Sequence, residues 1–368
     1  MKIESAVITH VRVPLVEPFR ISSGAVAAKD GIVVALHSDG LTGYGESSPM
    51  SGSFYSGDTP AKSWDELCSV VLPAIVGQTF EGPEDWNAAL DKMPAGNFTK
   101  TGVETAFWDI AAQQKGQPLH EMLGGTAAYV KSGLAVGLYD DLSDMLRAVE
   151  RYLADGYHRV KLKIEPGHDI EIVKAARKTF GDIPLFVDAN GAYSLKHLDV
   201  FRALDEFDLM MFEQPFAKDA LNDMATLQAA VRTPVCLDES LDTAEELQRA
   251  IALGSFRIAN FKIQRIGGFH HALQMLKLCR TNGILAWVGT MPELGIGQAQ
   301  GAALASLDGF VFPTDVEAST RWFQDDIISP FLQVHNGNIE MPKGPGLGYS
   351  VDPQKLLKYQ LARRTFPE

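Results

Sequence analysis

RVKLKIEP (159–166), LFVDANGAY (185–193), MMFEQP (210–215), VCLDES (235–240) and IANFKIQRIGG (258–268) are the segments that decide the fold. Each is a short apolar stretch that ends in polar residues. The polar residues that mark the repeat lie 25, 25, 25 and 24 positions apart, and they are Lys163, Asp188, Glu213, Asp238 and Lys262. A strand, a loop and a helix fill about that length, so the interval predicts one βα unit repeated along the chain.

Repeated βα units predict an α/β fold with a parallel sheet that closes into a TIM-like barrel. All strands of such a barrel end at one rim, where (β/α)8 enzymes build their active sites. The repeat therefore predicts that three carboxylates and two lysines surround one barrel mouth.

The 368 residues are enough for a barrel and a second domain. We predict an α+β capping domain over 1–125, a barrel over 126–318 and a C-terminal segment over 319–368. The capping domain is expected to begin with a β-meander that turns at Ser38-Asp39-Gly40 and to continue with helices over 60–125. The first barrel strand is expected at about 130–138, and the eighth is FVFPTD (310–315). The tail carries a hairpin sequence at Asn336-Gly337 and should return to the capping domain, because a closed barrel has no free sheet edge.

Composition excludes several classes of partner. A net charge of −13 argues against nucleic acid and anionic membranes. No apolar stretch is long enough to span a bilayer, and the alternating N-terminus does not resemble a signal peptide. The three cysteines are sparse and form no CxxC motif, which is typical of reduced thiols in a cytoplasm.

The three acids predict a metal site. Asp188, Glu213 and Asp238 would repel one another without a cation, and hard carboxylate oxygens with no His or Cys companion suit Mg²⁺, with Mn²⁺ as a possible substitute. Residues that follow the acids closely are expected to orient these ligands, and they are Asn190, Gln214 and Glu239.

Lys161 and Lys163 are two residues apart, so both point to one face of their strand. Helices cover the outer face of such a barrel, which leaves the inner face for the two lysines. Lys163 is expected at the rim and Lys161 one layer deeper, and the charge of the ion should lower their pKa values. Lys262 comes from the sixth strand, roughly opposite Lys163.

Two lysines that flank one cation suit the removal of a proton from the carbon next to a carboxylate. The cation stabilises the enolate, without which that proton is too weakly acidic. We predict that Lys163 removes the proton, and that Lys262 either returns one to the other face or stabilises the enolate during an elimination.

The ordered motifs KLKIEP, VDANGAY, EQP, LDES, NFKIQRIGG and GPGLG resemble those of the enolase superfamily, in its muconate-lactonizing subgroup, over nearly the whole chain. They are most similar to those of o-succinylbenzoate synthases and N-acylamino acid (N-succinylamino acid) racemases. The resemblance implies a capping domain, a (β/α)7β barrel, Mg²⁺ and an enolate intermediate. It assigns Lys163 and Lys262 as the acid–base pair and Asp188, Glu213 and Asp238 as metal ligands. Such barrels often form dimers or octamers, so a homo-oligomer is expected.

The residues expected to contact substrate come from the loops. We predict two loops, FRISSGAVAAKD (19–30) and PMSGSFYSGDTP (49–60). For the first, a plain connector is favoured over a mobile flap that covers a pocket. The adjacent aromatic residues of the second are either packed anchors or a wall of the substrate pocket. Arg265 and Glu293 match places that the family keeps. Asp315 and Glu317 loosely resemble the D-x-D that dipeptide epimerases use for the substrate ammonium, although a surface acid pair is favoured. The candidate substrate residues are Ser23, Phe54, Tyr55, Arg265, Met291, Glu293 and Asp315.

We expect a racemase of N-acyl (N-succinyl) amino acids, an o-succinylbenzoate synthase that works by dehydration, or both, acting on a small-molecule carboxylate. Both reactions begin with loss of the same proton. The alternatives are a dipeptide epimerase, a muconate-type cycloisomerase and a non-enzymatic metal-binding scaffold. A scaffold predicts loss of a lysine or a metal carboxylate, and none is lost.

Overall fold

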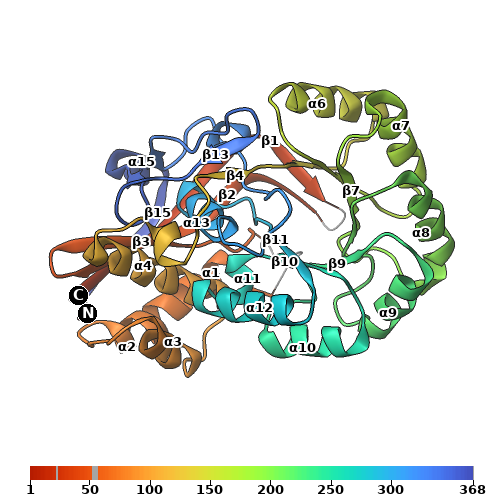
Figure 1. Cartoon of the computed structure of the whole chain (residues 1–368). Coiled ribbons are helices and arrows are strands. Elements are labelled where there is room, and N and C mark those ends of the chain that lie inside the picture. Colours follow the sequence, from red (N-terminus) through yellow and green to blue (C-terminus); the bar gives the residue numbers. More distant parts are fainter. Residues whose placement is uncertain (22–23, 52–56, 368) are drawn as a thin grey trace.

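The computed structural model describes residues 1–21, 24–51 and 57–367. An antiparallel sheet with its helices lies on one side of the molecule, and a parallel sheet ringed by helices lies on the other (Figure 1). Three candidate substrate residues, Ser23, Phe54 and Tyr55, fall outside the described residues.

The antiparallel sheet joins the two ends of the chain. Its strands run in the order β15-β1-β2-β3, with bounds Gln360–Phe366, Ser5–Ile21, Gly24–Ser38 and Leu41–Ser47. Asp39 and Gly40 take left-handed φ values of 51° and 76° between β2 and β3, which confirms the predicted turn. The loop predicted over 19–30 is wrong, because the β1–β2 ladder continues to the pair of Ile21 with Gly24. Pairing of β15 with β1 confirms that the tail returns to the capping domain.

Helix α4 (Asn97–Lys115) packs on β3 at unusually close range. A Cβ atom at Gly43 would lie 2.2 Å from the carbonyl oxygen of Ala106, and one at Gly45 would lie 2.0 Å from that of Gly102. The absence of side chains on this face of β3 lets the helix backbone approach the strand. The other helices of this half are α1 (Pro60–Glu66), α2 (Leu72–Ile75), α3 (Pro83–Asp91) and α5 (Leu119–Met122).

The parallel sheet follows the predicted repeat. Its strands lie side by side in chain order, and they are β5 (Leu134–Val136), β6 (Val160–Lys163), β7 (Leu185–Asp188), β8 (Phe212–Glu213), β9 (Val235–Leu237), β10 (Ile258–Phe261) and β11 (Leu285–Val288). The helices outside it are α6 (Leu142–Ala154), α7 (Ile170–Phe180), α8 (Leu198–Leu204), α9 (Leu221–Ala230), α10 (Ala244–Leu253) and α12 (Phe269–Thr281), with α13 (Gly295–Ala305) after β11 (Figure 1). A one-turn helix, α11 (Ile263–Ile266), directly follows β10 and Lys262.

Residues 310–315 lie where the eighth strand was predicted, between β11 and β5, but they form only isolated bridges and no strand. Val311 N donates to Ala286 O (3.0 Å) on the β11 side, and Gly133 N donates to Thr314 O (2.8 Å) beside β5. Pro313 has no N–H group, which keeps this ladder short. The single first strand predicted over 130–138 is wrong: β4 (Tyr129–Lys131) pairs with β13 (Asn338–Glu340) outside the barrel, and β5 alone enters the sheet.

The tail forms several short elements before it reaches β15. Asn336 and Gly337 adopt left-handed φ values of 48° and 71° between the bridged residues His335 and Asn338, which confirms the predicted hairpin turn. The remaining elements of the tail are α14 (Ser319–Trp322), β12 (Ile328–Ser329), β14 (Ser350–Val351) and α15 (Pro353–Tyr359).

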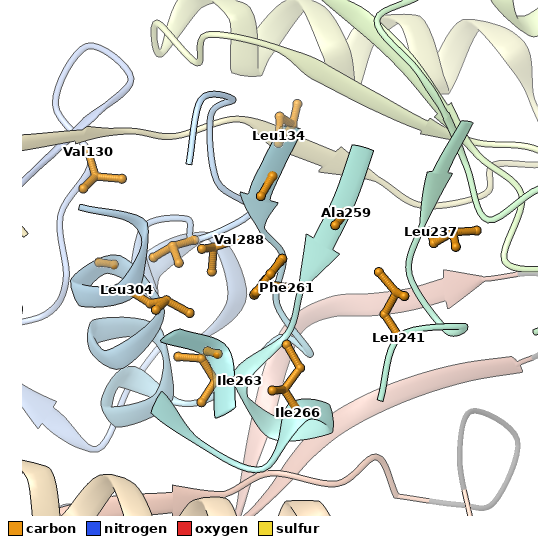
Figure 2. Close-up of a cluster of buried hydrophobic side chains, with 14 of the residues drawn as sticks. Val130, Leu134, Leu237, Leu241, Ala259, Phe261, Ile263, Ile266, Val288 and Leu304 are labelled. Carbon is orange, nitrogen blue, oxygen red and sulfur yellow. The ribbon is translucent and has the colours of Figure 1, made fainter. Parts of the chain in front are cut away.

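One hydrophobic core joins the two halves. Val11, Val13 and Val33 of the antiparallel sheet belong to the same buried cluster as the barrel residues Leu134, Phe261 and Val288, of which the barrel members are drawn in Figure 2. One face of the antiparallel sheet is therefore packed with the barrel, whereas residues such as Ile8 and Val34 belong to a separate cluster with the capping helices. Among the helices of the described residues, none is long and apolar enough to cross a bilayer.

The β3–α4 contact predicts a large effect of one methyl group. Gly45→Ala is expected to lower the free energy of unfolding by about 1–3 kcal/mol, because the methyl fits only if the helix moves away from the strand. Urea denaturation followed by tryptophan fluorescence measures this change. Gly344→Ala is the matched control, since a Cβ there meets no atom within 4 Å. Equal midpoints for the two variants would contradict the close contact.

Candidate active site

Sheet register brings the predicted residues to one rim. Lys163 lies opposite Asp188, and Asp188 lies opposite Glu213, at the ends of β6, β7 and β8. Between β8 and β9 the stagger changes: Glu213 pairs with Cys236, so Asp238 projects two residues further along the same face. β6 and β10 flank the three strands that carry the acids. This arrangement places one lysine on each side of them.

The lysines are directly bonded to the acids. Lys163 Nζ lies 2.5 Å from Asp188 Oδ2, and Lys262 Nζ lies 2.9 Å from Asp238 Oδ2. Lys161 Nζ lies 3.4 Å from Glu213 Oε2 and 3.5 Å from Asp188 Oδ2. Each of these side chains is no more than 8% exposed. The positively charged lysines and the negatively charged acids thus share a small buried volume, in which opposite charges compensate each other.

Lys161 differs from the expectation for its pKa. Burial lowers the pKa of this amine, but the carboxylates of Asp315, Glu213 and Asp188 raise it, and the net result is a pKa above the ordinary lysine value. The expected lowering neglected these three carboxylates, which surround the amine.

The donor set fits a hard divalent cation. Glu213 Oε2 is buried and accepts no hydrogen bond from the described residues. Burial, followed by the charge of Asp188, raises the pKa of Glu213 to about 8, so an added positive charge would relieve this carboxyl group. No group of three or more His, Cys, Asp or Glu side chains within the described ranges converges closely enough to hold an ion as it stands. The ammonium groups of the three lysines bind these acids instead.

The residues predicted to orient the acids lie close to them, and Asn190 donates its backbone N–H to Asp188 Oδ1 (2.9 Å). Asn190 Oδ1 accepts from Lys163 Nζ (2.7 Å), and its Nδ2 donates to Glu239 Oε1 (2.9 Å). Gln214 Oε1 accepts from the backbone N–H of Asp238 (2.9 Å). Asn190 and Gln214 have φ values of 41° and 36°, a left-handed conformation that is costly for residues with a side chain. The strain lies at the strand ends where the acids project.

The candidate substrate residues separate into two groups. Met291 and Asp315 line a cavity together with the three lysines and Asn190. Arg265 instead binds two acids, at 2.5 Å from Asp238 Oδ1 and 3.0 Å from Asp242 Oδ1. Glu293 is buried behind the cavity, where it accepts from Met291 N (3.0 Å), and burial, followed by the charge of Glu46, raises its pKa to about 7.

The surface acid pair expected at Asp315 and Glu317 is wrong. Both side chains are buried, at 3% and 0% exposure. Asp315 binds Lys161 Nζ at 2.6 Å and also the guanidinium of Arg159. Glu317 Oε1 accepts from the N–H of Ala135 (2.9 Å). The barrel closes through this segment, so its acids face inward and meet the buried cations.

Sequence reasoning did not predict several residues of this site. Arg159 precedes Lys161 by two positions, and Asn260 precedes Lys262 by two, so the two-residue period of a strand could have found both. Asn260 Nδ2 donates to Glu213 Oε1 (2.8 Å). Met50 and Trp322 line the cavity from the capping domain and the tail, and no motif marks them.

Comparisons with known proteins agree with this arrangement. Residues 3–124 match the mandelate racemase / muconate lactonizing enzyme N-terminal domain, and residues 144–355 match the enolase C-terminal domain-like family. An o-succinylbenzoate synthase of Geobacillus kaustophilus is 38% identical over 100% of this chain and 98% of its own length. An N-succinylamino acid racemase of Thermus thermophilus is 39% identical over 95% of this chain and 94% of its own.

The fold comparison gives the same family. A crystal structure of an enolase superfamily member from Listeria innocua superposes with a TM-score of 0.95 and 35% identity, and the match covers 99% of both chains. The chain therefore belongs to the enolase superfamily, in its mandelate racemase / muconate lactonizing enzyme family.

Proposed function

We propose that this chain is a Mg²⁺-dependent enzyme that removes the proton α to a substrate carboxylate, and that it racemises N-acyl (N-succinyl) amino acids, forms o-succinylbenzoate by dehydration, or does both. Relatives at 38% and 39% identity carry out each of these reactions, which is why both are retained. One observation carries the proposal: the amines of Lys163 and Lys262 flank the acids of β7, β8 and β9 and line one cavity.

Asp188, Glu213 and Asp238 would hold the cation, which stabilises the negative charge that develops on the substrate carboxylate when the proton leaves. Lys163 in its neutral form takes the α-proton at Nζ. Asn190 holds this amine through its Oδ1 atom, 2.7 Å away, which directs it toward the cavity. Lys262 donates a proton to the opposite face in the racemase, or remains a cation beside the enolate in the dehydration.

Lys161 and Asp315 form the floor of the site. Lys161 Nζ is bonded to the Asp315 carboxylate at 2.6 Å, and we assign it as an electrostatic partner of the substrate carboxylate. Burial of both side chains excludes water from this side of the cavity, which strengthens each charge interaction there.

A dipeptide epimerase is less compatible with these contacts. In a dipeptide epimerase, Asp315 would bind the ammonium group of the substrate. Here the Asp315 oxygens bind Lys161 and Arg159, and both partners are buried. A second ammonium would have to displace one of them, so an N-acylated substrate, which has no charge at that nitrogen, suits the site better.

Removal of either amine at the rim should abolish turnover. Lys163→Ala and Lys262→Ala are each expected to lower the rate of racemisation by about 10²–10⁴-fold. Each variant should still exchange the α-proton of one enantiomer with deuterium, because the other base remains. Lys174→Ala on the surface of α7 is the control and should turn over normally. Near-normal turnover by Lys163→Ala or Lys262→Ala would refute their assignment.

The reaction class follows from one panel of substrates. With Mg²⁺ in D₂O, N-succinyl amino acids should gain mass and lose optical purity, and the o-succinylbenzoate precursor should lose water, as mass spectrometry and circular dichroism can measure. Dipeptides with a free amine should show neither change. Epimerisation of dipeptides with inert N-succinyl amino acids would overturn the proposed substrate class.

The metal assignment predicts a defect in binding as well as in activity. Dialysis against a chelator should remove activity, and Mg²⁺ or Mn²⁺ should restore it. Glu213→Gln should weaken Mg²⁺ binding in titration calorimetry, because it removes one anionic oxygen donor. Glu245→Gln on the exposed face of α10 is the matched control. Equal Mg²⁺ affinities for the two variants would exclude Glu213 as a ligand.

A further inference from the structure

Helix α4 of the capping domain carries a row of polar side chains toward the barrel. Asn97, Thr101 and Glu104 are four and three residues apart, so they lie on one face of the helix. Thr101 and Glu104 are fully buried. Each of them has partners in the segment that directly follows Lys262. They also have partners elsewhere, which are Asp242 O for Asn97, Asn97 O for Thr101, and Trp108 and Asn87 for Glu104.

The first two members of this row bind the α11 turn. Asn97 Nδ2 donates to Arg265 O at 2.7 Å. Thr101 Oγ1 lies 3.2 Å from Ile263 O and 3.3 Å from Gln264 O, besides its bond to Asn97 O within α4. These contacts reach the backbone within three residues of Lys262.

Glu104 fixes the next helix. Its Oε2 accepts from Phe269 N (2.9 Å), and its Oε1 accepts from His270 N (3.0 Å), at the start of α12. Gly268 leaves the space for this approach, since a Cβ there would lie 2.3 Å from Glu104 Oε2. The carboxylate therefore satisfies amide groups that have no partner within the helix.

The α11 turn is also held on its other sides. Gln264 Nε2 donates to Glu46 O (2.8 Å), and its Oε1 accepts from Ser48 N (2.9 Å), which ties the turn to the end of β3. Ile263 and Ile266 lie on this turn in the same buried cluster as Phe261 and Leu304 (Figure 2). The turn thus sits between the capping domain and the barrel core.

The opposite lysine is supported differently. After Lys163, Ile164 N donates to Asp188 O (2.9 Å), and Glu165 and His168 bond to each other. These partners belong to the barrel itself. The segment after Lys163 is therefore held by the barrel, whereas the segment after Lys262 is held by the capping domain as well.

We propose that Asn97, Thr101 and Glu104 are positioning residues for Lys262, and that the capping domain controls proton transfer on one face of the substrate. The inference rests on the proposed function, because only a reaction with two bases can reveal a defect confined to one face. A misplacement of about 1 Å can cost roughly 10²-fold in rate. Loosening the α11 turn should slow the step at Lys262 and spare the step at Lys163.

The test measures α-proton exchange in the two single-lysine backgrounds. Asn97→Ala is combined with Lys163→Ala, where Lys262 alone exchanges, and with Lys262→Ala, where Lys163 alone exchanges. Deuterium uptake by an N-succinyl amino acid should fall by about 10- to 100-fold in the first background and by less than about 2-fold in the second. Equal slowing in both, or none in either, overturns the proposal. Thr101→Val should repeat the pattern more weakly.

Thr99→Val is the matched control. It removes a hydroxyl from the same helix at a buried position, but that hydroxyl bonds to Glu66 Oε2 (2.6 Å) inside the capping domain. If a general loss of stability in α4 slows exchange, Thr99→Val should therefore slow it equally in the Lys163→Ala and Lys262→Ala backgrounds. Selective slowing by Thr99→Val would show that any disturbance of α4 has this effect, and would refute a specific role for the row.

A second measurement does not depend on turnover. Backbone amide exchange followed by mass spectrometry should show faster exchange over 261–268 in Asn97→Ala and unchanged exchange over 160–166. If the unmodified chain neither exchanges the α-proton of any N-succinyl amino acid nor dehydrates the o-succinylbenzoate precursor, the proposed function fails. If it does exchange them and protection over 261–268 is unchanged in the variant, the positioning role fails alone.

Discussion

Pairing of opposite charges inside the barrel mouth is the constraint on which the rest of the structure depends. A buried charge without a partner is costly, so each lysine and arginine of the site must meet an acid. Lys163 bonds to Asp188, Lys262 to Asp238, and Lys161 to Asp315. The same pairs that make the site tolerable in a protein interior also place two amines beside the carboxylates of three neighbouring strands.

The capping domain is the second requirement, since the barrel alone does not complete the site. Close packing of β3 on α4 sets the position of the helix, and the helix in turn holds the turn that follows Lys262. Burial raises the pKa of Glu104 to about 7, which shows how far this contact is removed from water. The position of the turn after Lys262 and the packing of the capping domain are therefore linked through one helix.

Much of this architecture could be predicted from the sequence because it follows from periods. The 25-residue repeat gave the strand ends, and alternation along β6 placed Lys161 and Lys163 on one face. Contacts between distant segments carry no such period. Three features depend on how the ends of the chain close on the barrel. They are the burial of Asp315 against Arg159, the division of the first barrel strand, and the extension of the β1–β2 hairpin. Asn97 and Thr101 look like ordinary helix residues until the α11 turn lies beside them.

The central claim is that Asp188, Glu213 and Asp238 share one divalent cation between two opposed amines. The most direct measurement is a crystal structure of the chain with Mn²⁺ and an N-succinyl amino acid, in which anomalous scattering locates the ion. The account predicts one strong peak within bonding distance of all three carboxylates, with Lys163 Nζ and Lys262 Nζ on opposite faces of the substrate α-carbon. A peak elsewhere, or both amines on one face, would contradict it.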